Sequence, residues 1–248
     1  MNARATVLAA LAATTARAPA NLPLPERLCR ACVEVLGADG GAITLASTLP
    51  ERLTLDSSNG TSARIEDLQD VLGEGPGQDA YRRGTAVVAH VDGIQGGPFP
   101  MFTELAGDIA GPVTVWAIPM HPGGATIGVI TLYRVSGDLL YSVEDAQFLA
   151  DAVGAALLDD SSPDAGGRFA KWSDRARVHQ AVGMTVAQLA IEPDDALAIL
   201  RAHAFAEATT LDAIAIEVVE RRLDFRPGEQ DVFQDETRPQ DSSGNEET

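Results

Sequence analysis

Apolar and polar residues follow two different periods along the first 160 residues. In 25–38, Leu28, Cys32, Val35 and Leu36 fall on one side of a helix that begins at Pro25, a favoured first helical residue. Alternating or β-branched patterns predict strands at 41–47, 52–57, 85–91, 113–121 and 126–135, and the last two are joined by the short turn "PGGA". Further helical patterns occupy 65–84, as short turns broken by glycines, then 102–110 and 142–158.

The order of these elements predicts an α+β fold. The helix at 142–158 begins with a capping-box pattern, Ser142 with Asp145, and carries a long aliphatic stripe. We expect an antiparallel sheet with helices packed on one face, forming a domain over 22–158. Residues 1–21 precede it as an N-terminal helix or arm. Their alanine-rich start is superficially similar to a signal peptide, but an amphipathic helix is the preferred interpretation.

The remaining residues predict a second, all-helical domain. A linker rich in Ser, Pro, Gly and Asp covers 159–168, and a polar acidic tail covers 227–248. Between them, 169–226 predicts a bundle of three helices: one from about Trp172 to Ala190, one from Pro193, and one opened by a capping box of Thr209 with Asp212.

Charge and composition narrow the classes of function. The chain has 18 basic and 36 acidic residues, a net charge of −18, so its overall field repels phosphate and excludes a general polyanion binder. Residues 168–226 nevertheless hold 8 of the 18 basic side chains, so any anion site is expected there. No apolar run approaches the ~20 residues of a membrane span, and only two cysteines are present, so we expect a cytoplasmic, reduced protein.

No pattern of catalytic or metal-binding residues stands out. Cys29 and Cys32 form a CxxC without a second pair at zinc spacing, and they are interpreted as buried residues of a helix face. "GEGPG" lacks the lysine and spacing of a phosphate-binding loop, and is interpreted as a turn at the rim of a ligand pocket. We therefore expect no enzymatic activity. Four large side chains line either a small-ligand pocket or the core: Phe102, Trp116, Met120 and Tyr133.

Two segments carry a resemblance to known families. "GEGPGQDAYRRGTAVVAHVD" (73–92), "AIPMHPGGATIGVITLYR" (117–134) and the helix that follows resemble a GAF sensor module. "RARVHQAVGMTVAQLAI" and "DDALAILRAHAFAEATTLDAIAIEVVERR" resemble the ANTAR domain, a three-helix RNA-binding unit of bacterial transcription antiterminators. Together they are similar to the actinobacterial GAF–ANTAR regulators.

The resemblance implies a GAF domain that senses a small-molecule or protein signal and an ANTAR domain that binds RNA. It implies a homodimer that binds paired hexaloop stem-loops in a nascent transcript and so permits read-through of a terminator. The polar positions that match the ANTAR pattern, and are therefore the implied RNA-binding residues, are His179, Gln180, Arg201, His203, Thr209 and Thr210.

This chain departs from the ANTAR pattern at one position. Ala181 and Gly183 match, but Val182 stands where the family has a lysine. The missing lysine removes a phosphate or base contact, which leaves an alternative: a dimeric ligand-binding or protein-interaction module whose ANTAR domain no longer binds RNA. In either case, the aliphatic stripes of 5–36 and 142–158 predict helices that pair across a dimer.

Overall fold

The computed structural model describes residues 3–46, 52–94, 97–159 and 166–226 of the chain. Within these ranges, the strands are β1 (Gly40–Ala46), β2 (Arg52–Ser57), β3 (Val87–Val91), β4 (Val113–Met120) and β5 (Gly128–Arg134). The helices are α1 (Ala3–Arg17), α2 (Leu24–Leu36), α3 (Gly60–Leu72), α4 (Pro76–Arg83), α5 (Pro100–Ala110), α6 (Val143–Asp159), α7 (Gly166–Leu189), α8 (Pro193–Ala206) and α9 (Leu211–Val219). The predicted acidic tail lies outside the described residues.

The five strands form one antiparallel sheet in the order β2-β1-β5-β4-β3. β4 and β5 form the predicted hairpin, with Ile118 opposite Ile130. β5 therefore lies at the centre of the sheet, between β4 and β1, and its side chains alternate between two buried faces.

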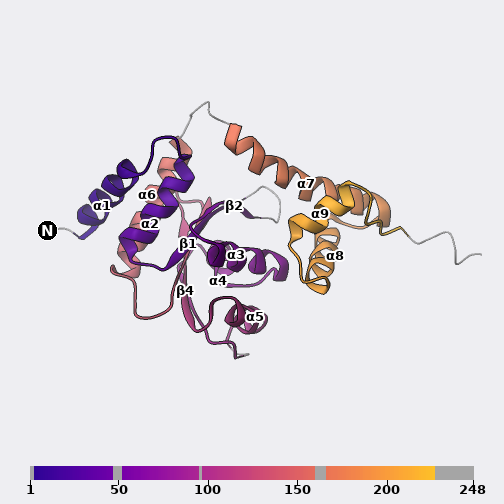
Figure 1. The fold of residues 1–248 in the computed structure, drawn as a ribbon, viewed down its shortest axis with the longest axis horizontal. Helices are drawn as coiled ribbons and strands as arrows, with labels where there is room; N and C mark the ends of the chain where they lie inside the picture. Colours follow the sequence, from indigo (N-terminus) through magenta and orange to yellow (C-terminus); the bar gives the residue numbers. More distant parts are fainter. Residues whose placement is uncertain (1–2, 47–51, 95–96, 160–165, 227–248) are drawn as a thin grey trace, which may run out of the picture.

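Helices cover both faces of the sheet (Figure 1), so the prediction of helices on one face only is wrong. Ile118 and Ile130 point toward α1, α2 and α6, whereas Val115 and Tyr133 point toward α3 and α5. The strands contain almost continuous apolar residues because both faces are buried, and a one-sided sheet would instead alternate apolar with polar residues.

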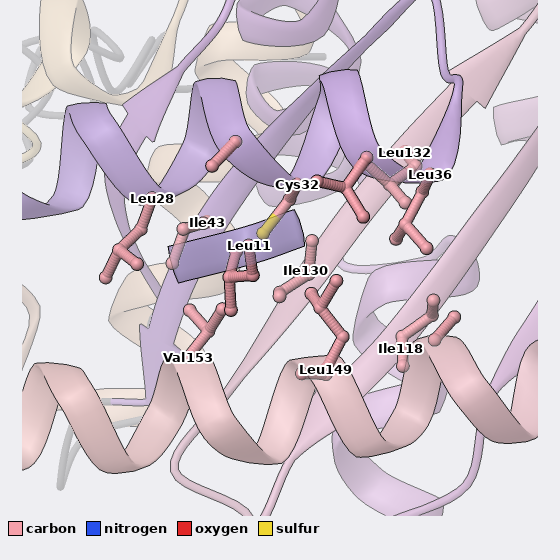
Figure 2. Packing of buried hydrophobic residues seen from close by; sticks show 14 of the residues in the cluster. Leu11, Leu28, Cys32, Leu36, Ile43, Ile118, Ile130, Leu132, Leu149 and Val153 are labelled. Carbon is pink, nitrogen blue, oxygen red and sulfur yellow. The ribbon is translucent and has the colours of Figure 1, made fainter. Parts of the chain in front are cut away.

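The larger core lies between the sheet and α1, α2 and α6 (Figure 2). Val7 and Leu11 of α1 are buried against α2 and α6 of the same chain. The predicted stripe at 5–36 thus belongs to two helices that pack within one protomer, and the same packing covers the stripe of α6. These stripes are therefore covered within the chain, and pairing of the helices across a dimer stays a prediction.

The two predicted capping boxes can be compared with the structure, and one of them is displaced by a residue. Ser142 Oγ accepts a hydrogen bond from the amide of Asp145, at 3.2 Å, as the capping box predicts. α9 is capped by Thr210, whose Oγ1 accepts from the amide of Ala213 at 3.2 Å, so the prediction of Thr209 as the cap was one residue early.

Helices α7, α8 and α9 pack into a bundle with its own apolar core. α7 begins at Gly166, earlier than predicted, and reaches into the segment interpreted as linker. The bundle lies beside α3, so α3 is between the sheet and the bundle (Figure 1). No helix in the described part of the chain is both long and apolar enough to cross a membrane.

Candidate functional site

Three polar side chains lie on the inner face of α3, the face turned toward the sheet. Ser62, Glu66 and Gln69 are spaced by four and three residues, which places them on one side of the helix. All three are buried, with exposed fractions of 3 %, 1 % and 0 %. The inner face of a helix is normally apolar, so a buried polar stripe marks α3 as a candidate site.

Asn59 fixes the start of α3 against the sheet. Its Oδ1 accepts a hydrogen bond from the amide of Ser62 at 2.8 Å, which caps the helix. Its Nδ2 donates to the hydroxyl of Tyr133 on β5 at 3.0 Å. Gly40 leaves room for this contact, because a Cβ at that position would lie 2.4 Å from the Asn59 Nδ2.

A narrow void lies between α3 and the sheet. It is too narrow for a water molecule. Thr131 of β5 borders the void, is 4 % exposed, and its Oγ1 has no hydrogen-bond partner among the described residues. A buried hydroxyl without a partner is costly, so this edge of the void is chemically suited to a hydrogen-bonding ligand. The lining residues are Gly41, Ala42, Ser62, Ile65, Glu66, Thr131, Leu132 and Tyr133.

Hydrogen bonds connect the void to the next helix. Gln69 Nε2 donates to Glu66 Oε1 at 2.9 Å, and Gln69 Oε1 accepts from the amide of Gly77 at 2.7 Å, at the amino end of α4. Gly75, with φ of 136°, makes this approach possible, because a Cβ there would lie 2.6 Å from Gln69 Oε1. The "GEGPG" segment therefore forms a turn between two helices, and its place at the rim of a ligand pocket stays a prediction.

The outer face of α3 carries charge toward the bundle. Partial desolvation and, to a smaller extent, the neighbouring carboxylates of Asp70, Asp212 and Glu66 together raise the pKa of Asp67 to about 6. Asp212 belongs to α9, so the carboxylates of Asp67 and Asp212 repel each other where α3 and α9 meet.

The four predicted pocket residues do not share a pocket. Phe102 and Tyr133 are buried on the α3 and α5 side of the sheet. Trp116 and Met120 are buried on the opposite side, in the core with α2 and α6. Only Tyr133 borders the void under α3, because residues 116 and 120 of β4 point to the other face.

The predicted RNA-binding residues are spread over the bundle. Gln180 is exposed and His179 half-buried, one turn from Val182, which packs partly against the bundle core. Arg201 is engaged instead with the GAF-like part: its Nε donates to the carbonyl oxygen of Asp70 at 2.8 Å. Thr210 caps α9, and Thr209 is half-buried just before it.

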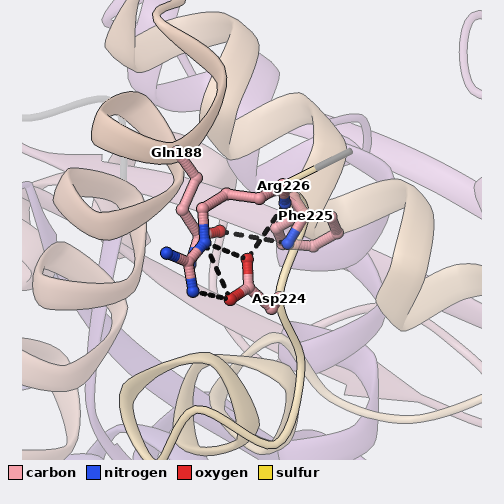
Figure 3. Close-up of polar contacts among 4 residues, drawn as sticks. All are labelled: Gln188, Asp224, Phe225 and Arg226. Atoms are coloured by element: carbon pink, nitrogen blue, oxygen red, sulfur yellow. Dashed lines mark hydrogen bonds and ion pairs between the residues drawn. The ribbon is translucent and has the colours of Figure 1, made fainter. Parts of the chain in front are cut away.

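His203 contacts the end of the described chain. Its ring meets Phe225 edge-on, with centroids 5.1 Å apart. The amide of Phe225 donates to Gln188 Oε1 of α7 at 3.1 Å (Figure 3). Arg226 hydrogen-bonds Asp224 and lowers the pKa of that exposed carboxyl to about 2. These contacts hold the segment after α9 against the bundle, and His203 is one of the residues that contact it.

Thiol and metal chemistry find little support in the described residues. Cys29 and Cys32 are both buried, and burial raises the pKa of both thiols, that of Cys32 to about 12, so neither is a ready nucleophile. No group of three or more His, Cys, Asp or Glu that could hold a metal ion occurs in the ranges that the structure describes. The Nδ1 of His121 lies 3.0 Å from Asp151 Oδ1. His90, on β3, forms a separate contact with the hydroxyl of Thr114.

Sequence reasoning missed Glu66, Gln69 and Thr131. Glu66 and Gln69 are residue types that normally face solvent, and Thr131 is an ordinary strand residue. One signal was present: Ser62, Glu66 and Gln69 occupy the helical positions that apolar residues would need if α3 packed on the sheet in the usual way.

Comparison with known proteins bears on residues 25–157, which match the sequence model of the GAF domain. The match ends before α7. A search of curated proteins finds no match.

Several solved structures align with the chain at low identity. The A. aeolicus NLH2 GAF domain, in an inactive state, is 16 % identical, with 62 % of this chain and 93 % of that one covered and a TM-score of 0.42. The chromophore-binding domain of Stigmatella aurantiaca bacteriophytochrome is 16 % identical, with 64 % and 59 % covered and a TM-score of 0.38. The photosensory core module of the S. aurantiaca phytochrome is 15 % identical, with 81 % and 44 % covered and a TM-score of 0.39.

The family match spans α2 to α6, and it includes the whole sheet and the polar face of α3. It covers more than half of the chain, and on that basis the chain belongs to the GAF domain family.

Proposed function

We propose that this chain is a non-enzymatic signalling regulator in which the GAF domain senses a small molecule or protein and controls an ANTAR-type, RNA-binding bundle formed by α7, α8 and α9. The observation that carries the proposal is the position of α3. Its inner face borders the polar void and its outer face packs against α8 and α9. A single helix therefore adjoins both the candidate sensory site and the candidate output unit.

The sensory part of the proposal rests on the buried polar groups under α3. Glu66 and Thr131 lie at the same void, one a carboxyl and the other a hydroxyl. Such groups favour a small ligand that forms hydrogen bonds, because an apolar ligand would leave the Thr131 hydroxyl unsatisfied. Since the void has no room for a water molecule, a ligand enters only if α3 moves away from the sheet.

The RNA-binding part rests on the ANTAR resemblance of 175–222 together with the exposure of Gln180. Loop bases of an RNA hairpin are unstacked and present edges that an amide side chain can read. Binding of paired hairpins by a homodimer would add avidity, which helps a chain of net charge −18 that gains little from general attraction to phosphate.

Filter binding of the full chain to a pair of linked hexaloop hairpins tests this function. We expect retention above that of a scrambled RNA, decreasing between two salt concentrations. Gln180→Ala should weaken binding about tenfold, since a lost base contact costs about 1–3 kcal/mol. Ser136→Ala is the matched control: Ser136 is an exposed, uncharged residue of the GAF domain, and its loss should leave binding unchanged.

Val182 favours a second candidate function. It stands at the lysine position of the ANTAR pattern, and a valine has no positive charge to offer a phosphate. Its side chain packs partly against the bundle core. The alternative is a dimeric ligand-binding or protein-interaction module without RNA binding. This alternative is supported if the filter retains no more of the paired hairpins than of scrambled RNA at both salt concentrations. The same result is required of a variant in which a mutation breaks the contact between α3 and the bundle.

A further inference from the structure

The carboxyl end of α3 forms a specific contact with α8. Arg201 Nε donates to the carbonyl oxygen of Asp70 at 2.8 Å. Asp70 lies in the last turn of α3, where carbonyl groups have no partner within the helix and carry partial negative charge. The guanidinium also lies over Gly73, the capping glycine, where an added Cβ would lie 3.4 Å from Nη1. Arg201 thus neutralises the negative end of α3.

An apolar contact accompanies the polar one. Val71 of α3 is 8 % exposed and belongs to the buried cluster of the bundle, together with Leu197 and Leu200 of α8. A residue of the GAF domain therefore completes the core of the output unit. The two contacts are adjacent in sequence, so any displacement of this end of α3 disturbs both.

The same turn of α3 is connected to the polar void. Gln69 bonds Glu66, which lines the void, while its own carbonyl accepts from the amide of Gly73 at 2.9 Å. The side-chain amide of Gln78 on α4 lies 3.4 Å from the Gln69 carbonyl oxygen. Hydrogen bonds therefore run from the void to the turn that holds Arg201.

We propose that this contact is an autoinhibitory latch, formed by Asp70 and Val71 of α3 and the capping Gly73 with Arg201 and the core of the bundle. It rests on the proposed function: Arg201 is one of the implied RNA-binding residues, and in the latched form its side chain is committed to α3. A ligand that displaces α3 from the sheet releases the latch and frees Arg201 for RNA.

The test uses the full chain with Val71→Glu, which places a carboxylate in the bundle core and opens the latch. If about nine tenths of the wild-type molecules are latched, the variant should bind the linked hairpins about tenfold more tightly, because apparent affinity scales with the competent fraction. Small-angle X-ray scattering should show a larger radius of gyration. Arg64→Gln is the matched control, since it makes the same change of charge at an exposed position of α3 and should alter neither measurement.

Val71→Thr guards against loss of folding, since it keeps the shape of the side chain and should shift both measurements in the same direction by less. Wider scattering without tighter RNA binding, in a chain that does bind RNA, would overturn autoinhibition. Unchanged scattering in both variants would overturn the latch itself. If neither wild type nor variants retain RNA while scattering widens, the proposed RNA-binding function fails and the α3–α8 contact stands.

Discussion

Thr131 and Thr44 are two buried threonines on strands β5 and β1 of the same sheet, and they differ in one respect. Thr44 Oγ1 donates to the carbonyl oxygen of Val129 at 3.1 Å. Thr131 Oγ1, within the described residues, meets no partner. Their sequence contexts are equivalent, β-branched residues in apolar strands, so only the neighbouring elements decide whether a hydroxyl is satisfied.

This difference predicts opposite effects of the same substitution. Thr131→Val should stabilise the ligand-free chain by about 1 kcal/mol, because it removes an unsatisfied buried hydroxyl at constant shape. Thr44→Val should destabilise it by about 1 kcal/mol, because it removes a hydrogen bond. Urea unfolding of both variants measures the two free energies. Equal losses in both would show that the Thr131 hydroxyl has a partner in solution and is no mark of a ligand site.

At the scale of elements, α3 shows how far the sequence could be read. Residues 65–84 predicted short helical turns broken by glycines, yet α3 is a regular helix of 13 residues that begins before this segment. The sequence does not show the helical spacing of apolar residues in α3, because Ser62, Glu66 and Gln69 occupy positions on its inner face that are usually apolar. The strands and α6 were predicted within a few residues, since their apolar patterns obey the packing rule that α3 breaks.

The contact between α3 and α9 predicts a titration. The raised pKa of Asp67, about 6, means that the docked state binds a proton more tightly than the free carboxyl, so docking loses stability as pH rises from about 4 to 6. Solvent screening keeps this effect on stability small, because the Asp67 side chain is only partly removed from solvent. In Asp212→Asn the pKa of Asp67 should fall toward its ordinary value, though burial keeps part of the shift.

Carbon-detected NMR of the Asp67 carboxyl across pH 3–8 checks this. Asp194→Asn removes the same charge from an exposed position at the start of α8 and should leave the Asp67 titration in place. A pKa insensitive to Asp212 would show that α9 does not lie against α3 in solution.

At the scale of the whole molecule, the sequence predicted the order of most elements, but it placed the cover of α1 in a second subunit, whereas the structure has it in the same chain. An amphipathic stripe specifies that a helix must bury one face; it does not specify whether the cover comes from the same chain. Here Val7 and Leu11 close over α2 and α6 of their own protomer. Homodimerisation remains a prediction of the family resemblance.

Packing within one protomer predicts how unfolding depends on concentration. Leu11→Ala should lower the free energy of unfolding by about 2–3 kcal/mol, the usual cost of emptying a buried leucine site. The loss should be the same from low to high protein concentration, because no subunit contact is broken. Leu158→Ala, at a position 67 % exposed at the end of α6, should cost less than about 0.5 kcal/mol. A loss at Leu11 that shrinks with concentration would place α1 in a subunit interface.

The two ends of α3 are held very differently. Asn59 ties the amino end to β5 through Tyr133, whereas the carboxyl end is held by the bundle. A tilt of α3 about Asn59 would therefore move the carboxyl end of the helix most. Eleven residues of helix make an arm of about 16 Å, so a tilt of about 5° would move the Asp70 carbonyl by about 1.4 Å. A displacement of this size would break the hydrogen bond of 2.8 Å between Arg201 Nε and the Asp70 carbonyl oxygen. A ligand therefore has to move α3 by only a fraction of the ligand's own width to break this bond.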